Sequence, residues 1–380
     1  MKFIYAFLGY LSFKKLIKSS INKKIIFFSE SKNYRNYLLN LMRSFEDEKK
    51  ISIIYLTSDI NDSEKISNNI NPIYIGSGFF RILLFSFIRC EMVVMTLTDL
   101  GNHEIKRSPN CKSYVYVFHS LVSIHKCYTQ KAFENYDIIL SNGLYQKKEL
   151  EYCEKLFNFN KKKIYNTGYP YLENLFKNKH QNINLQQKNK ILFALSWSKN
   201  RNNLFDKHTE RILKDLIAKN YDIVLRIHPE TLKRSSKTIK NIENSLGNLK
   251  NFEINKNLMN LKPLNESSIL ITDNGGIALE YFIAQRKPVL YLNHTDKIHN
   301  ELFYKINIPT LEDQFKNLIG ITMQHDELDQ IDFYIEKTKK KFDKKKYIID
   351  ELIKENQIVL KNQTQNAKKI LLESLEEINY

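Results

Sequence analysis

Short apolar runs alternate with helical stretches along most of this chain, and this rhythm limits the folds that it can adopt. Strands buried on both faces of a sheet have continuous apolar sequences, because helices cover both sides of that sheet. The stretches between the runs, such as residues 34–45, 79–88 and 146–156, have helical patterns. The pattern therefore predicts parallel α/β sheets, with strands at residues 25–28, 51–56, 72–75, 92–95, 114–118, 138–140, 164–166, 191–195, 223–227, 252–254, 269–272 and 289–292.

One polar segment interrupts this rhythm. Residues 178–190 contain almost no apolar side chains, and the alternation of strands and helices restarts after them. We therefore predict two Rossmann-like α/β domains in tandem, an acceptor-side domain over residues 1–185 and a nucleotide-donor domain over residues 186–310. Residues 311–380 are predicted to form a helical C-terminal extension. In such a pair the carboxyl ends of the two sheets face each other across a central cleft, where ligands bind.

The composition excludes several classes of protein. With 42% hydrophobic and 27% charged residues, the chain has the composition of a globular protein, and wholesale disorder is excluded. Its four cysteines form no C-x-x-C pair, which argues against a disulfide scaffold and against a cysteine zinc site. No apolar run reaches the roughly 18 to 20 residues of a membrane-spanning helix. We therefore expect a reduced cytoplasmic protein that needs no metal or other cofactor.

The net charge of +17 is spread along the chain, and its lysine clusters are not interleaved with aromatic residues. We therefore expect no nucleic-acid partner, whereas a polyanionic substrate or an anionic membrane surface suits this charge. The first eighteen residues are apolar and aromatic before they become basic. An amphipathic helix over residues 1–20 could lie on the inner face of the cell membrane, or the same helix could pack on the first domain.

Two adjacent glycines form the first candidate binding motif. The sequence Asp273-Asn274-Gly275-Gly276 follows a predicted strand and precedes a helical stretch, in a chain that has only ten glycines. Such a loop can bind phosphate, because backbone N–H groups approach an anion where Cβ atoms are missing and the helix start supplies positive potential. The alternative is a tight turn in which Asp273 caps the helix. Glu280, one helical turn further on, could face a nucleotide ribose or solvent.

A histidine follows a predicted strand in each half of the chain. His228 shares a strand face with Arg226, and together they could neutralise a diphosphate and stabilise a leaving group. His119 follows a strand of the first half, where a neutral imidazole could deprotonate an acceptor hydroxyl. The spacing of the other histidines does not indicate a metal site.

Three further residues complete the predicted substrate-binding set. Ser120 and Lys126 belong to the segment that begins at His119, and Ser196 closes the first strand of the second half, where its hydroxyl could meet a phosphate. Trp197, the only tryptophan of the chain, is more simply explained as a residue of the core.

Taken in order, these motifs resemble those of the CDP-glycerol glycerophosphotransferase family, the polymerases and primases of teichoic-acid and capsule synthesis. The resemblance implies a GT-B fold and transfer of glycerol phosphate from CDP-glycerol to a hydroxyl, with release of CMP. It also implies that His119 is the base, that His228 lies near the donor phosphates, and that the segment beginning at Asp273 binds the donor. The segments that carry it are 116–126, 135–137, 168–170, 225–229, 270–276, 278–281 and 287–289.

The sequence also departs from the family pattern. The family usually has His-Gly where this chain has His119-Ser120, and Ser-Asp-Tyr-Ser-Ser where this chain has residues 272–276. Tyr171 stands where an arginine often follows Gly-Tyr-Pro. We therefore expect a transferase that moves glycerol phosphate from CDP-glycerol to a hydroxyl of a cell-surface polysaccharide or lipid-linked precursor. One alternative is a GT-B glycosyltransferase with a CMP-, UDP- or GDP-sugar donor, and another is a non-catalytic protein that binds polyanions through its lysine-rich tail.

Overall fold

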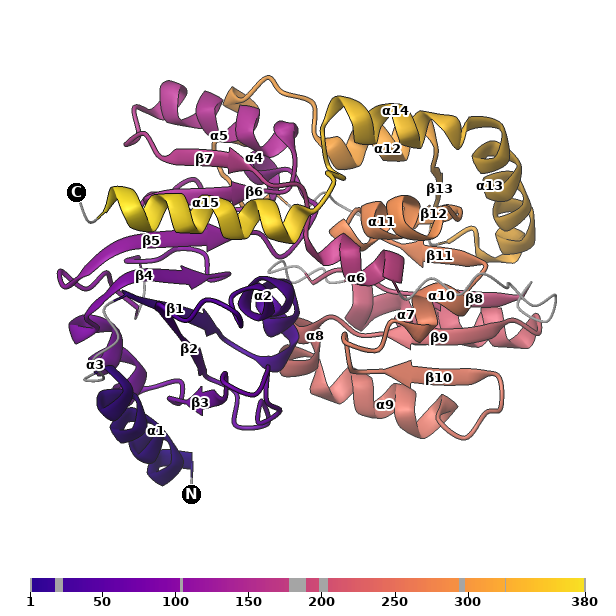
Figure 1. Cartoon of the computed structure of the whole chain (residues 1–380). Helices are drawn as coiled ribbons and strands as arrows, with labels where there is room; N and C mark the ends of the chain where they lie inside the picture. The colour runs from indigo at the N-terminus through magenta and orange to yellow at the C-terminus, as the bar shows by residue number, and fades with distance from the viewer. Residues whose placement is uncertain are drawn as a thin grey trace.

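Two parallel sheets lie side by side in the computed structural model, each covered by helices on both faces (Figure 1). The structure describes residues 2–17, 23–102, 105–177, 189–197, 204–293, 298–324 and 326–378. Within these ranges the first sheet has the strand order β3-β2-β1-β4-β5-β6-β7, and the second has the order β10-β9-β8-β11-β12-β13. Neighbouring strands in both sheets are parallel. This arrangement confirms the predicted α/β, GT-B-like fold class.

Each predicted strand is present, with bounds that differ by a few residues. The first sheet contains β1 (Lys23–Ser29), β2 (Ile51–Thr57), β3 (Pro72–Tyr74), β4 (Cys90–Met95), β5 (Cys111–Val117), β6 (Ile138–Ser141) and β7 (Lys163–Asn166). The second contains β8 (Lys190–Phe193), β9 (Asp222–Arg226), β10 (Phe252–Asn255), β11 (Ile269–Thr272), β12 (Val289–Leu292) and β13 (Ile321–Met323). The last of these, β13, was not among the predicted strands.

The helices alternate with these strands and continue beyond them. They are α1 (Lys2–Ile17), α2 (Lys32–Ser44), α3 (Phe79–Phe87), α4 (Ile124–Cys127), α5 (Leu144–Phe157), α6 (Tyr171–Lys177), α7 (Leu204–Ala218), α8 (Pro229–Arg234), α9 (Ser236–Leu246), α10 (Lys262–Glu266), α11 (Gly276–Glu280), α12 (Leu311–Leu318), α13 (Ile331–Lys345), α14 (Tyr347–Glu355) and α15 (Gln363–Glu377). Helix α11 continues directly into a π-helical turn over Tyr281–Gln285.

Side chains of the sheets alternate between two cores, as the pleat of a strand requires. In β1, Ile26 and Phe28 join a core that also holds Leu84 of α3, whereas Ile25 and Phe27 face a core on the other side of the sheet. The second sheet has two cores of the same kind, one under α7, α9 and α13 and the other under α6, α12 and α14. Because both faces of both sheets are buried, the strands have the continuous apolar sequences from which they were predicted.

Two helices cross between the halves of the molecule. Helix α6 follows the first sheet in the chain, yet Leu172 and Leu175 pack in a core of the second sheet. Helix α15 near the C-terminus returns to the first sheet, where Leu371 and Leu375 pack in the same core as α2 (Figure 1). The segment after residue 310 is therefore mostly helical, but it contributes β13 to the second sheet and α15 to the first. Most of the predicted linker, with the predicted boundary at residue 185, lies outside the described residues.

Helix α1 packs against the outer end of the first domain (Figure 1). Phe13 lies in a core of the first sheet, and the ring of Phe3 lies 4.8 Å from that of Phe80 in α3. Gly9 contacts the chain at Tyr74 so closely that a Cβ there would overlap the carbonyl of that residue. Packing on the first domain, one of the two predicted arrangements, is thus observed. No helix in the described ranges is both long enough and apolar enough to cross a membrane.

Candidate active site between the two domains

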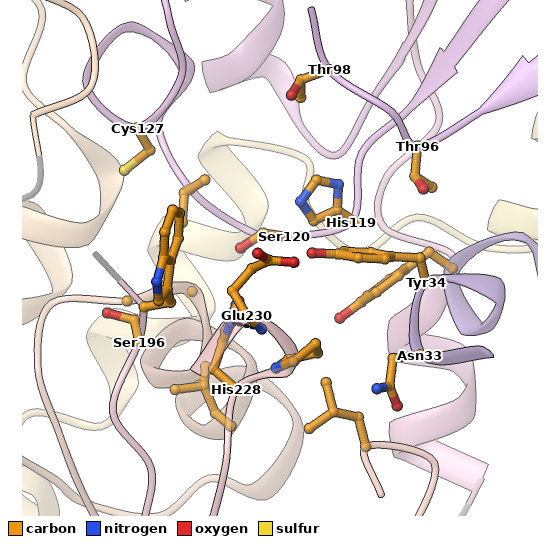
Figure 2. Close-up of a pocket in the computed structure, with 18 of the residues that line it drawn as sticks. Asn33, Tyr34, Thr96, Thr98, His119, Ser120, Cys127, Ser196, His228 and Glu230 are labelled. Atoms are coloured by element: carbon orange, nitrogen blue, oxygen red, sulfur yellow. Dashed lines mark hydrogen bonds between the residues drawn. The ribbon is translucent and has the colours of Figure 1, made fainter. Parts of the chain in front are cut away.

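A cavity of about 340 Å³ lies between the two sheets, at the carboxyl ends of their strands (Figure 2). The order of the first sheet reverses between β1 and β4, and that of the second between β8 and β11. Ligands of α/β sheets bind at such reversal points, because the loops after the two strands diverge there. Segments that follow all four of these strands line the cavity. It is therefore the candidate active site of the chain.

Most of the predicted site residues meet at this cavity. Those that line it are His119, Ser120, Ser196, Arg226, His228, Asn274, Gly275, Gly276 and Glu280. The two other predicted residues, Lys126 and Asp273, are buried beside it and bind its lining residues or their neighbours.

His119 lies among aromatic rings on the first-domain side of the cavity. Its ring centre is 5.2 Å from that of Tyr34 and 6.2 Å from that of Tyr128, and its Nδ1 is 3.4 Å from the hydroxyl of Tyr116. Burial disfavours the imidazolium form and lowers the pKa of His119 to about 4, although a hydrogen bond with the backbone of Thr96 works in the other direction. The imidazole is therefore neutral at physiological pH and can accept a proton.

His228 lies on the opposite side of the cavity, at the start of α8 (Figure 2). Its Nδ1 accepts a hydrogen bond of 3.1 Å from the backbone N–H of Glu230, and it thereby caps the helix. Because Nδ1 uses its lone pair in this way, the proton of the neutral ring is on Nε2. His228 thus has an N–H at Nε2, whereas His119 is a neutral imidazole.

Arg226 and Glu280 are buried at the second-domain end of the cavity. The guanidinium of Arg226 donates to the carbonyls of Leu258 and Asn260, at 2.9 Å each. The carboxylate of Glu280 accepts a hydrogen bond of 2.9 Å from the hydroxyl of Tyr169. Burial raises the pKa of Glu280 to about 7, although this hydrogen bond and the charge of Arg226 work to lower it. Burial of the carboxylate thus places its titration near neutral pH.

The segment from Asp273 to Gly276, here called the glycine loop, is held at its first two residues by side-chain hydrogen bonds. Asp273 accepts hydrogen bonds from the backbone N–H and the hydroxyl of Ser196, at 2.9 and 2.5 Å. The amide nitrogen of Asn274 donates to Asp313 of α12 at 2.7 Å. Gly275 follows as the N-cap of α11, and Gly276 is the first residue of this helix. Asp273 therefore ties the loop to the neighbouring strand end.

Lys126 is connected to the glycine loop through Asp313. Its ammonium lies 2.9 Å from one carboxylate oxygen of Asp313, and the other carboxylate oxygen accepts the hydrogen bond from Asn274. Burial works to raise the pKa of Asp313, but hydrogen bonds from Thr310 and Lys126 outweigh it and hold the pKa below its usual value. The three side chains thus join the two domains beside the cavity.

Several lining residues were not among the predicted ones. Glu30 and Tyr34 follow β1, Thr96 follows β4, and Glu230 begins α8. Trp197, predicted to be a core residue, also lines the cavity, and its ring lies 5.1 Å from the guanidinium carbon of Arg234. Glu30 and Thr96 each stand directly after a strand in the sequence. This position indicates a site residue only when the order of the strands in the sheet is known.

Two carboxyl groups that line the cavity, those of Glu30 and Glu230, have pKa values shifted in opposite directions. Burial raises the pKa of Glu30, although the charges of Lys233 and Arg81 work to lower it. Burial also works to raise the pKa of Glu230, but its hydrogen bonds with Lys233 and Arg234 dominate and lower it.

Among the described residues, no group of three or more His, Cys, Asp or Glu side chains is placed to hold a metal ion.

The chain is similar to known proteins in sequence and in fold. The family model of CDP-glycerol:poly(glycerophosphate) glycerophosphotransferases matches residues 11–305. Among solved structures, the wall teichoic acid polymerase TagF matches over 99% of this chain and 98% of that chain, with a TM-score of 0.57 and 14% identity. A variant of TagF soaked with CDPG matches over 100% of this chain and 94% of that chain, with a TM-score of 0.59 and 16% identity.

A second group of similar structures consists of UDP-GlcNAc 2-epimerases. The enzyme from Neisseria meningitidis bound to UDP-GlcNAc matches over 94% of this chain and 100% of that chain, with a TM-score of 0.58 and 13% identity. At such low identities these structures show that the fold is shared and nothing finer. No curated protein matches the chain at a significant level.

Proposed function

The chain belongs to the CDP-glycerol:poly(glycerophosphate) glycerophosphotransferase family, and from this premise we propose that it transfers glycerol phosphate from CDP-glycerol to a hydroxyl of a cell-surface polysaccharide or lipid-linked precursor. CMP is the second product. The observation that carries the proposal is the pair His119 and His228, which line one cavity from opposite domains with opposite hydrogen-bonding roles.

The acceptor is activated on the first-domain side. The acceptor hydroxyl gives its proton to the neutral imidazole of His119, and its oxygen attacks the phosphorus that carries glycerol. The bond between this phosphorus and the oxygen that bridges to CMP breaks, and CMP leaves with the electron pair. A general base typically contributes 10²- to 10⁴-fold to such a rate. The pKa of about 4 keeps the imidazole of His119 unprotonated but makes it a weaker base than a free imidazole, so the role assigned to it rests on its place in the cavity.

The donor is bound on the second-domain side. His228 donates from Nε2 to a phosphoryl oxygen, and Arg226 adds a fixed positive charge near the same group. The glycine loop and Ser196 hold the nucleotide end of the donor. The position of these residues after β8, β9 and β11 supports this assignment, because ligands bind at the carboxyl ends of parallel strands.

A donor panel tests the proposal. The enzyme is incubated with CDP-glycerol, CDP-ribitol, CMP-sugars, UDP-sugars and GDP-sugars, with membrane extract or capsule fragments as acceptor, and the released nucleotide is measured. We expect CMP from CDP-glycerol alone. His119→Ala should lower the rate of this release by 10²- to 10⁴-fold, whereas His208→Ala on α7, outside the cavity lining, should not lower it. Release of UDP or GDP would instead identify the glycosyltransferase alternative, and a CMP-sugar is distinguished by identifying the group transferred.

A surface of the first domain suits peripheral attachment to an anionic membrane, and we propose this attachment as part of the function. Helices α1 and α3 expose large apolar side chains side by side, among them Phe3 and Phe87 at 68% exposure each and Phe79 at 65%. Neither helix contains a carboxylate, while Lys14 and Lys15 are exposed on α1. Apolar side chains next to lysines bind the interface of anionic bilayers, because the burial of apolar surface and the attraction of lysines to anionic lipids both favour binding.

Vesicle flotation tests the attachment. We expect the protein to float with vesicles that contain phosphatidylglycerol and to float less with vesicles of phosphatidylcholine alone. Phe3→Ser combined with Phe87→Ser should weaken this binding. Phe333→Ser on α13, which removes a side chain of 58% exposure from the other domain, is the matched control and should not. Equal flotation of all three proteins would contradict the assignment of this surface.

A further inference from the structure

The side chain of Ser120, a residue of the other domain, lies against Gly276. The backbone of Gly276 has no positive φ angle, so its own conformation does not require glycine. A Cβ at this position would instead overlap Oγ of Ser120, and it would lie 3.3 Å from a methyl group of Val122. The hydroxyl of Ser120 thus occupies the space where a side chain of residue 276 would begin.

The neighbouring glycine is explained by a second serine. A Cβ at Gly275 would lie 2.8 Å from Cβ of Ser196 and 3.1 Å from its hydroxyl. The two glycines are therefore covered by two serine side chains, one from the end of β8 in the same domain and one from the other domain. The hydroxyl of Ser196 is used within the protein, because it donates to Asp273.

The hydroxyl of Ser120 faces the cavity instead. Figure 2 shows Ser120 near the centre of the cavity, between His119 and Ser196. Among the hydrogen bonds of the described residues, Ser120 takes part only through its carbonyl, which accepts from Asn142. Its hydroxyl is therefore available to a ligand that lies on the glycine loop.

We propose that Ser120 and Gly276 are a contact pair across the cleft, in which the hydroxyl of Ser120 binds a phosphoryl oxygen of the donor from the acceptor-side domain. This inference rests on the proposed function for the identity of the donor. It places a donor contact and the base on consecutive residues of the first domain, so that both approach the donor from the same side. Ser120 is then a positioning residue for donor phosphate, and Gly276 makes room for it.

A double-mutant cycle in the absence of ligand tests the pairing. Thermal unfolding is measured for the wild type, for Gly276→Ser, for Ser120→Gly and for the double variant. We expect Gly276→Ser to lower the unfolding midpoint in the wild-type background and to lower it much less in the Ser120→Gly background. Contacting residues give such non-additive effects. Equal lowering in both backgrounds would overturn the pairing, and this readout does not depend on which donor the enzyme uses.

Kinetics with CDP-glycerol test the role of the hydroxyl. Ser120→Ala should raise KM for CDP-glycerol by roughly ten- to a hundredfold, the cost of a lost hydrogen bond to a charged group, with a smaller change in kcat. The double variant Ser120→Gly with Gly276→Ser should recover most of this loss relative to Ser120→Gly alone, because it returns one hydroxyl to the loop. Ser86→Ala on α3, outside the cavity lining, is the control.

The outcomes separate the inference from the proposed function. An unchanged KM in Ser120→Ala, or no recovery in the double variant, would overturn the role of the hydroxyl while transfer from CDP-glycerol stands. A wild-type enzyme that does not use CDP-glycerol would overturn the proposed function, and the unfolding cycle would still decide whether Ser120 and Gly276 are paired.

Discussion

Lys126 and Asp313 form an ion pair of 2.9 Å across the two domains, and through it the first domain reaches the glycine loop. The second carboxylate oxygen of Asp313 accepts from Asn274, and Thr310 donates to the first. Asp313 thus connects a cation of the first domain to a loop residue that lines the cavity. This connection links the segment that begins at His119 to the loop that we assign to the donor.

Removal of the carboxylate should loosen the loop. For Asp313→Ala we expect the free energy of unfolding to fall by about 1–3 kcal/mol, since charged hydrogen-bond donors lose their acceptor. KM for the donor should rise more than kcat falls. Lys126→Met, which leaves the bond between Asp313 and Asn274 in place, should raise KM less. Urea unfolding and steady-state kinetics measure both effects, and an equal rise of KM in the two variants would contradict this order.

The low pKa of His119 predicts a pH dependence of stability. The folded state keeps this imidazole neutral down to pH about 4, whereas in the unfolded chain it binds a proton below a pH of about 6.5. The unfolded state therefore binds more protons in this window, and stability falls as the pH is lowered through it. Between pH 7 and pH 5 the wild type should lose about 2 kcal/mol more than His119→Asn. Parallel pH profiles of the two proteins would refute the assignment.

The raised pKa of Glu280 predicts that its contribution to stability changes with pH in the opposite direction. Its pKa of about 7 means that the folded state keeps a proton which the unfolded state releases above a pH of about 4.3. Stability from this residue is therefore largest at low pH and falls as the pH rises toward 7. Between pH 5 and pH 8, Glu280→Gln should become more stable relative to the wild type by about 2–3 kcal/mol. Denaturant titrations at the two pH values measure this, and a constant difference would disprove it.

Arg226 should not be replaceable by lysine. Its guanidinium is held by the carbonyls of Leu258 and Asn260, a planar arrangement that an ammonium cannot reproduce. We expect Arg226→Lys to raise KM for the donor by about tenfold or more, in line with the loss of a fixed charged hydrogen bond. Arg211→Lys on the exposed face of α7 is the control and should have no effect. A wild-type KM in Arg226→Lys would remove this residue from the donor site.

The strands could be predicted because burial on both faces leaves a continuous apolar run in the sequence. The short strand β13 contains Thr322 between Ile321 and Met323 and lies at the edge of its sheet, so it has no such run. The return of α15 to the first sheet could not be predicted, because an amphipathic pattern does not say which sheet its apolar face will cover.

The candidate site likewise contains residues that the local sequence predicts and residues that only the fold brings together. His119, His228 and the glycine loop were found because each follows its own strand in the sequence. Glu30 and Thr96 were missed because they become neighbours of these residues only through the order of the strands. The closeness of Ser120 to Gly276 joins positions far apart in the chain, and the sequence showed it only as two separate departures from a family pattern.

The central claim is the transfer of glycerol phosphate from CDP-glycerol with His119 as the base. It is tested most directly by mass spectrometry of a defined hydroxyl acceptor after incubation with CDP-glycerol, together with quantitation of the nucleotide. The account predicts that the acceptor gains one glycerol phosphate for each CMP released, and that His119→Ala lowers this rate by 10²- to 10⁴-fold with donor affinity nearly unchanged. An acceptor that gains a sugar from a nucleotide sugar instead, or full activity of His119→Ala, would contradict it.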